Sequence, residues 1–201
     1  MKTSILGIVL FLLAILPLSA QKNINDKDFL LNYFEETTEN LENQISGLSK
    51  EQMHFKPSEE NWSVSQCVEH IVLTEKMLFE MAKTEMEKPA NPERKEEVKI
   101  KDEDLIEGMK DRSQKFQAGE ELTGKGKYDS PAKALADFKE QRQKVLDYIQ
   151  ETPLENFRNH ISDSPFGPMD AYQSTLFIAG HTARHTLQIE EVKANENFPS
   201  E

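Results

Sequence analysis

The stretch SVSQCVEH, residues 63–70, carries the clearest helix start in the chain. Ser63 is a candidate N-cap, and Gln66 three residues later can bond back to the cap and complete a capping box. Apolar residues follow at helical spacing, which predicts one buried stripe made of Cys67, Ile71, Leu73, Met77, Leu78 and Met81. The stretch therefore predicts a long amphipathic helix.

Three more segments have the same character. A helix is expected over residues 26–48, with a buried stripe of Phe29, Leu30, Tyr33, Phe34, Leu41 and Ile45. Another begins at Ser130, with Pro131 in its first turn, and its stripe is Leu135, Phe138, Val145, Leu146 and Ile149. The last runs over residues 170–192. Four such helices predict an all-α fold, a four-helix bundle with long connections between its helices.

The connections are polar and rich in proline and glycine. Residues 87–104 and 118–130 are expected to be loops, with a weaker helix between them over residues 105–116. Residues 162–172, SDSPFGPMDAY, are expected to form a turn. No segment alternates convincingly between apolar and polar residues, so no strand is predicted.

The first twenty residues have the layout of a secretory signal peptide. A basic start at Lys2 precedes an apolar run from Ile5 to Leu16, and small residues lie before Gln21. A membrane anchor is the alternative, but the run is shorter than the ~20 residues that cross a bilayer. We therefore expect an exported protein, periplasmic or extracellular, with a signal peptide over residues 1–20, one domain over residues 21–201 and no membrane span after cleavage.

The composition excludes one class of partner. The chain has 36 acidic and 24 basic residues and a net charge of −12, and such a surface repels the phosphates of nucleic acid.

The single cysteine, Cys67, cannot form an internal disulfide, and we expect its thiol to be buried and unreactive.

Three histidines are predicted to face the interior of the bundle. His181 and His185 are four residues apart in GHTARHTLQIEEV, residues 180–192, so they lie about 40° apart on one helical face. His70 shares the inner arc of its own helix with Cys67 and Thr74. Three inward imidazoles predict a metal site at His70, His181 and His185, because a buried neutral cluster without an ion needs partners for every ring nitrogen. Hydrogen-bonded core histidines without a metal are the alternative.

Such a donor set suits zinc, nickel, cobalt or iron, and three protein ligands leave one coordination position open. A water or thiol bound there would have a lowered pKa and become a nucleophile near neutral pH. The candidates for orienting the rings are Glu69, Thr74, Gln188, Glu190 and Glu191. His54 and His160 fall in predicted connections and are expected at the surface.

These residues resemble a known family. WSVSQCVEHIVLTE together with FIAGHTARHTLQIEEV is similar to the DinB-like superfamily, which includes bacillithiol and mycothiol S-transferases and mycothiol-dependent maleylpyruvate isomerases. The matching residues are Trp62 with Ser63, then His70, His181 and His185, followed by Gln188. The resemblance implies a DinB-like four-helix bundle that binds one divalent metal ion through the Nε atoms of the three histidines, and it favours a homodimer.

The resemblance also implies a reaction class. Characterised members activate a low-molecular-weight thiol at the metal and add it to an electrophile. We therefore expect a divalent-metal-dependent enzyme with S-transferase-like or hydrolase-like chemistry on a small-molecule substrate. Hydrolysis is the variant that needs no cytoplasmic thiol, which fits an exported protein. The alternative is a non-catalytic exported bundle that binds metal or serves a structural role. No general base is evident, because Glu69 points about 100° away from His70 on the helix.

Overall fold

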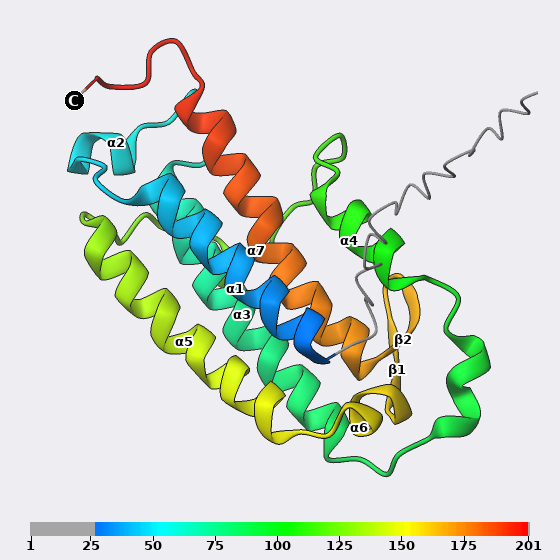
Figure 1. Cartoon of the computed structure of the whole chain (residues 1–201). Coiled ribbons are helices and arrows are strands. Elements are labelled where there is room, and N and C mark those ends of the chain that lie inside the picture. Colours follow the sequence, from blue (N-terminus) through cyan, green and yellow to red (C-terminus); the bar gives the residue numbers. More distant parts are fainter. Residues whose placement is uncertain (1–26, 201) are drawn as a thin grey trace, which may run out of the picture.

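Four long helices lie side by side in the computed structural model, which describes residues 27–200. They are α1 (Lys27–Ile45), α3 (Val64–Met86), α5 (Pro131–Glu151) and α7 (Ala171–Lys193). α7 packs against both α1 and α3, while α5 packs against α3 and α1. In Figure 1, α7 lies between α1 and α4. The predicted all-α four-helix bundle is confirmed.

Shorter elements lie between the long helices. They are α2 (Lys50–His54), η1 (Pro92–Glu97), α4 (Asp102–Lys110), η2 (Glu120–Leu122) and α6 (Leu154–Asn159), where η marks a 3-10 helix. α4 packs along α7 and covers the bundle beside it. The helix predicted over residues 105–116 therefore begins earlier and ends earlier than expected. Phe116, its expected last apolar residue, lies beyond α4 and is 71% exposed.

A short hairpin replaces the turn expected over residues 162–172. β1 (Ile161–Ser164) pairs antiparallel with β2 (Gly167–Asp170), so the prediction that the chain has no strand is wrong. Each strand has only four residues, too few for an alternating pattern to be recognised in the sequence. Gly167 has a positive φ of 101°, which a residue with a side chain rarely adopts.

The predicted helix starts are largely confirmed. Ser63 Oγ accepts the amide of Gln66 at 3.2 Å, and Gln66 Oε1 accepts the amide of Ser63 at 3.0 Å, so the capping box is complete. Asp170 caps α7 by accepting the amide of Gln173 at 2.8 Å. Pro131 occupies the first turn of α5, but the Ser130 side chain makes no capping bond there.

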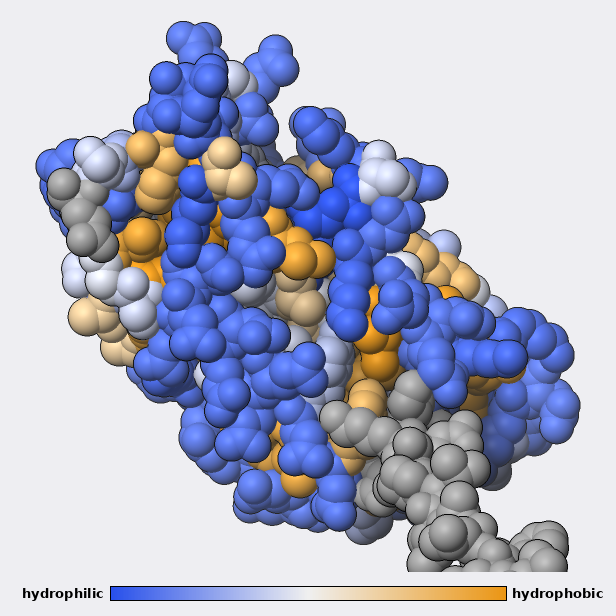
Figure 2. Space-filling model, turned by 45° about the horizontal axis from the view of Figure 1, so that its top comes forward, coloured by the Kyte–Doolittle hydropathy of each residue, from blue (hydrophilic) through white to orange (hydrophobic). Residues whose placement is uncertain are grey.

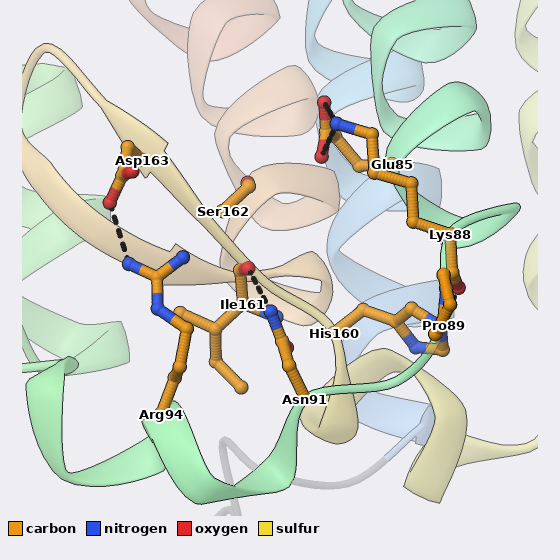
Figure 3. Close-up of a pocket in the computed structure, with 9 residues that line it drawn as sticks. All are labelled: Glu85, Lys88, Pro89, Asn91, Arg94, His160, Ile161, Ser162 and Asp163. Carbon is orange, nitrogen blue, oxygen red and sulfur yellow. Dashed lines mark hydrogen bonds and ion pairs between the residues drawn. The ribbon is translucent and has the colours of Figure 1, made fainter.

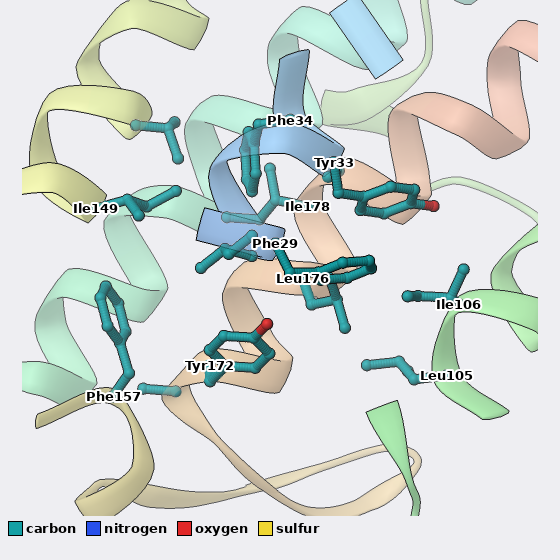
Figure 4. Close-up of a cluster of buried hydrophobic side chains, with 14 of the residues drawn as sticks. Phe29, Tyr33, Phe34, Leu105, Ile106, Ile149, Phe157, Tyr172, Leu176 and Ile178 are labelled. Atoms are coloured by element: carbon teal, nitrogen blue, oxygen red, sulfur yellow. The ribbon is translucent and has the colours of Figure 1, made fainter. Parts of the chain in front are cut away.

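The core consists of apolar residues from all four long helices, joined by residues of α4 and α6. Figure 4 shows one of its two clusters, in which aromatic rings from α1 and α7 meet Leu105 and Ile106 of α4. The stripe predicted for α1 is confirmed, since Phe29, Leu30, Tyr33, Phe34, Leu41 and Ile45 are all buried.

The stripe predicted for α3 needs a correction. Met81 is 57% exposed, and Leu73, Met77 and Leu78 are only partly buried. The buried face instead includes the polar residues Thr74 and Glu75. The spacing of apolar residues could not predict this face, because Glu75 points inward toward a buried charge on α5.

That charge is Arg142, which is 1% exposed. Its guanidinium donates to Glu75 at 3.1 and 2.6 Å, to Phe34 O at 3.1 Å, to Thr37 Oγ1 at 3.0 Å and to Thr182 Oγ1 at 2.8 Å. These five contacts match the five N–H donors of a guanidinium. One side chain of α5 is thus bonded to α1, α3 and α7.

The face drawn in Figure 2 is mainly hydrophilic. Figure 2 shows one face on which hydrophobic residues form separate small areas between polar ones. No helix within residues 27–200 is long and apolar enough to span a membrane. The predicted signal peptide, residues 1–20, lies outside the described residues.

The Arg142–Glu75 pair generates a stability prediction. Replacing Glu75 by Ala leaves a buried guanidinium without its counter-charge, which typically costs about 3–5 kcal/mol. We expect urea unfolding to show a loss of that size. Glu140→Ala is the matched control, because Glu140 pairs with Lys144 where the two side chains are 74% and 55% exposed; it should cost less than about 1 kcal/mol. Equal losses for the two variants would contradict this account.

Candidate metal centre

Three imidazoles from two helices converge in the interior of the bundle. His70 comes from α3, and His181 and His185 come from successive turns of α7. The Nε2 atoms of His70 and His181 are 3.1 Å apart, and one potential ligand atom from each of the three rings lies within 4.8 Å of the others. His70 is 4% exposed, and the two histidines of α7 are half-buried. The structure therefore brings together the three residues that the sequence predicted as one site.

Hydrogen bonds set the direction of two of the rings. Nδ1 of His70 lies 2.8 Å from the carbonyl oxygen of Leu122 and 3.3 Å from Thr74 Oγ1. Nδ1 of His185 lies 2.8 Å from Gln188 Oε1. A carbonyl oxygen only accepts, so these Nδ1 atoms carry the hydrogen and leave Nε2 with a lone pair. In His70 that lone pair faces Nε2 of His181, 3.1 Å away.

An aromatic side chain lies against the cluster. The ring centroid of Trp62 is 4.9 Å from that of His70 and 6.1 Å from that of His185. Trp62 immediately precedes the cap of α3, so the same capping box that begins the helix also places the indole on the imidazoles. The indole is thus in ring contact with two of the three imidazoles.

All three imidazoles are held in the neutral form. Burial, together with the neighbouring His70, lowers the pKa of His185 to about 3, against the opposing effect of its bond to Gln188. Burial likewise lowers the pKa of His181 well below its ordinary value, with contributions from His185 and His70. Burial also lowers the pKa of His70, against the opposing effect of its bond to Leu122. Neutral imidazole is the form that ligates a metal.

The residues predicted to orient the rings divide into two groups. Thr74 and Gln188 contact the histidines as expected. Glu190 instead bonds Gln44, and Glu191 forms an ion pair with Arg112. Glu69 points away from the imidazoles, as its helical angle predicted, and accepts backbone amides of a neighbouring loop.

Sequence reasoning missed the Leu122 carbonyl. A backbone acceptor carries no side-chain signal, and residue 122 is 52 positions away from His70 in the chain. No pattern in the sequence could have identified it.

The remaining histidines and the cysteine do not belong to the group of candidate ligands. His54 ends α2 and bonds Asp129 at 2.7 Å. His160 follows α6 and contacts the carbonyls of Asn156 and Lys88. Both are half-buried rather than fully exposed. Cys67 is buried, as predicted, and burial raises its pKa to about 12, which disfavours the reactive thiolate.

A pocket of about 330 Å³ lies elsewhere, between the end of α3, η1 and the hairpin. Figure 3 shows that its charged side chains already have partners: Lys88 pairs with Glu85, and Arg94 pairs with Asp163, each at 2.7 Å. Because these charged side chains pair with one another, the pocket is a weaker candidate than the histidine cluster.

The donor set fits a divalent transition metal. Two nitrogens on a tetrahedral zinc ion are about 3.3 Å apart, close to the 3.1 Å between Nε2 of His70 and of His181. The group of candidate ligands found among residues 27–200 consists of these three histidines, without a carboxylate or thiolate. Imidazole donors of this kind favour zinc, nickel, copper or iron over magnesium or calcium.

Comparisons with known proteins agree with this fold. An uncharacterised protein of Bacillus subtilis, YuaE, is 26% identical over 165 residues, which are 81% of this chain and 96% of that protein. A solved structure, YfiT from Bacillus subtilis, matches with a TM-score of 0.59 and 14% identity over 86% of this chain and 89% of that chain. YfiT is described as a probable metal-dependent hydrolase with an unusual four-helix bundle topology. Residues 33–189 match the family model of the DinB superfamily. With its bundle and its histidine cluster in place, the chain belongs to the DinB superfamily.

Proposed function

We propose that this protein is an exported, divalent-metal-dependent enzyme that acts on a small molecule, with His70, His181 and His185 as the metal ligands. The observation that carries the proposal is the convergence of three neutral imidazoles, two of them with Nδ1 engaged by oxygen acceptors. Export rests on the leader-like first twenty residues.

The number of ligands favours catalysis over a purely structural site. Structural zinc sites usually have four protein ligands, whereas catalytic ones have three and an open position. A metal ion bound here would lower the pKa of a water or thiol in that open position and so supply a nucleophile near neutral pH. Hydrolysis is the proposed reaction, because it needs no thiol cofactor and because the similar fold of YfiT belongs to a probable metal-dependent hydrolase.

The chain's own residues have defined tasks in this proposal. Leu122 and Gln188 keep hydrogen on Nδ1 and so direct Nε2 of His70 and His185 toward the ion. Trp62 shields one side of the cluster from water. Thiol transfer remains the second reaction to test, since the DinB resemblance implies it.

Metal content is the first prediction from this proposal. Protein purified without a metal-binding tag should contain close to one zinc, nickel or other divalent ion per chain by elemental analysis. His181→Ala/His185→Ala should contain none, because it removes two of the three nitrogen donors. His54→Ala/His160→Ala is the matched control and should keep the ion, since neither histidine belongs to the cluster.

A wild-type protein that stays empty after incubation with these ions, and gains no thermal stability from them, would rule out the metal site. The three histidines would then be core residues joined by hydrogen bonds.

The pH dependence of stability is the second prediction. In metal-free protein, His181 and His185 have lowered pKa values, so between about pH 6.5 and 4 the unfolded chain binds protons that the folded chain does not. The free energy of unfolding should therefore fall as the pH falls through this range, by up to about 1.4 kcal/mol per pH unit for each histidine. Urea titrations at several pH values measure the slope.

The His181→Ala/His185→Ala variant should show a shallower slope over the same range. The comparison isolates the two imidazoles, because both proteins contain the same charged residues around the site. These residues are Glu69, Arg112, Arg184 and Glu191. Identical slopes would contradict the lowered pKa values of His181 and His185.

Turnover is the third prediction. We expect protein loaded with zinc or nickel to hydrolyse members of a panel of small esters and amides, and the rate to drop to that of metal-free protein in His181→Ala. A parallel panel of thiol–electrophile pairs tests S-transfer. One bound ion per chain without turnover in either panel would favour a non-catalytic metal-binding bundle.

A further inference from the structure

A long loop lies over the histidine cluster. We call residues 111–127, which connect α4 with the approach to α5, the strap. Apart from the short η2 turn, the strap is irregular. In Figure 1 it leaves the upper end of α4 and passes behind α7 toward the start of α5. Irregular segments usually open more easily than helices, so the contacts that hold this one matter for the site beneath it.

At one end, the strap is held by a carboxylate. Glu69 Oε2 accepts three consecutive amides, those of Lys125 at 2.7 Å, Gly126 at 2.8 Å and Lys127 at 3.1 Å. Gly126 has a positive φ of 79°, and a residue in this conformation lets successive amides point into one anion-binding concavity. The chain fills that concavity with its own Glu69.

A second glycine brings the strap close to α3. A Cβ on Gly124 would lie 2.2 Å from the carbonyl oxygen of Gln66, so only glycine fits. Gln66 Nε2 also donates to Gly124 O at 3.1 Å. The two glycines of TGKGKY, residues 123–128, therefore have separate tasks. Gly124 lets the strap approach α3 closely, and Gly126 directs the amides toward Glu69.

At the other end, the strap is held by a cation. Arg184 is 8% exposed, and its guanidinium donates to the backbone carbonyls of Met109, at 3.3 Å, of Asp111, and of Gln114, at 2.5 Å. The aromatic ring of Phe116 lies 5.4 Å from it. The cation thus binds the end of α4 and the beginning of the strap.

Glu69 and Arg184, the two anchors of the strap, each lie next to a candidate metal ligand in the chain. Glu69 directly precedes His70, and Arg184 directly precedes His185. Between the anchored ends lies Leu122, whose carbonyl accepts the Nδ1 hydrogen of His70. The strap is thus bonded to the residues next to two of the three histidines and supplies the acceptor that orients one of them.

We propose that Glu69 and Arg184 are positioning residues of the metal site, which hold the strap so that the Leu122 carbonyl keeps Nε2 of His70 directed at the metal. This inference rests on the proposed function, because it assumes that the three histidines bind the ion. It also gives Glu69 a task other than that of a general base, since the oxygen that accepts the three amides faces the strap.

Zinc affinity and strap protection test the proposal together. Groups that orient a metal ligand typically contribute 10- to 100-fold to metal affinity, so Glu69→Gln and Arg184→Lys should each weaken Zn²⁺ binding by about that factor in competition with a chelating indicator. In metal-free protein, hydrogen exchange of the amides at residues 125–127 should speed up in Glu69→Gln. The ¹⁵N signals of His70 should show a smaller share of the Nδ1–H tautomer in both variants.

The matched controls are Glu80→Gln, on the exposed side of α3, and Arg94→Lys, in η1. Both should leave zinc affinity, amide exchange and the tautomer unchanged. Gly126→Ala acts from the strap side and should reproduce the loss of affinity without changing either anchor. It provides the same test if Glu69→Gln fails to fold.

Faster exchange in the strap with unchanged zinc affinity and tautomer would overturn the proposal, since the anchors would then serve stability alone. Unchanged exchange in Glu69→Gln would overturn it as well. A wild-type protein that binds no zinc would refute the proposed function instead. The tautomer of His70 in metal-free protein would then still decide whether the strap orients the ring.

Discussion

The bundle depends on the hydrogen bonds and the ion pair that the buried guanidinium of Arg142 makes with the other three long helices. A buried cation is tolerated only when its donors and its charge are both satisfied, and here the acceptors come from three other helices. That requirement determines which face of α3 turns inward, because Glu75 must reach the centre. It also fixes α7 at Thr182, the residue that follows His181 in the chain. The helix that carries two of the imidazoles is thereby held in register with the helix that carries the third.

Near the imidazoles, one anionic and one cationic side chain form hydrogen bonds with the backbone. The anionic Glu69 accepts amides, and the cationic Arg184 donates to carbonyls. Each charge is used to hold a loop, and neither belongs to the group of candidate ligands. The imidazoles contribute no negative charge, so a bound divalent ion would keep most of its charge and its ability to polarise a ligand.

The parts of this structure that could be predicted from sequence are those with a local physical signal. The Ser63 capping box, the apolar stripe of α1 and the i, i+4 pair on α7 each follow from the spacing of residues along one helix. The errors arise where a residue distant in the sequence determines which side chain is buried. Met81 was placed in the core by spacing alone, whereas Glu75 was missed because its partner lies on α5. The four-residue strands and the Leu122 carbonyl have no distinctive side-chain pattern, so only the folded chain reveals them.

The enclosed thiol has a practical consequence. Cys67 is the only cysteine of the chain, and its sulfur lies inside the second apolar cluster, beside Val64, Val68 and Ile71. A folded molecule therefore exposes no thiol from which a disulfide between copies could form. The protein can also be handled without dithiothreitol or similar reductants. Because such thiols bind zinc and nickel themselves, their omission leaves the metal occupancy of the histidines undisturbed while it is measured.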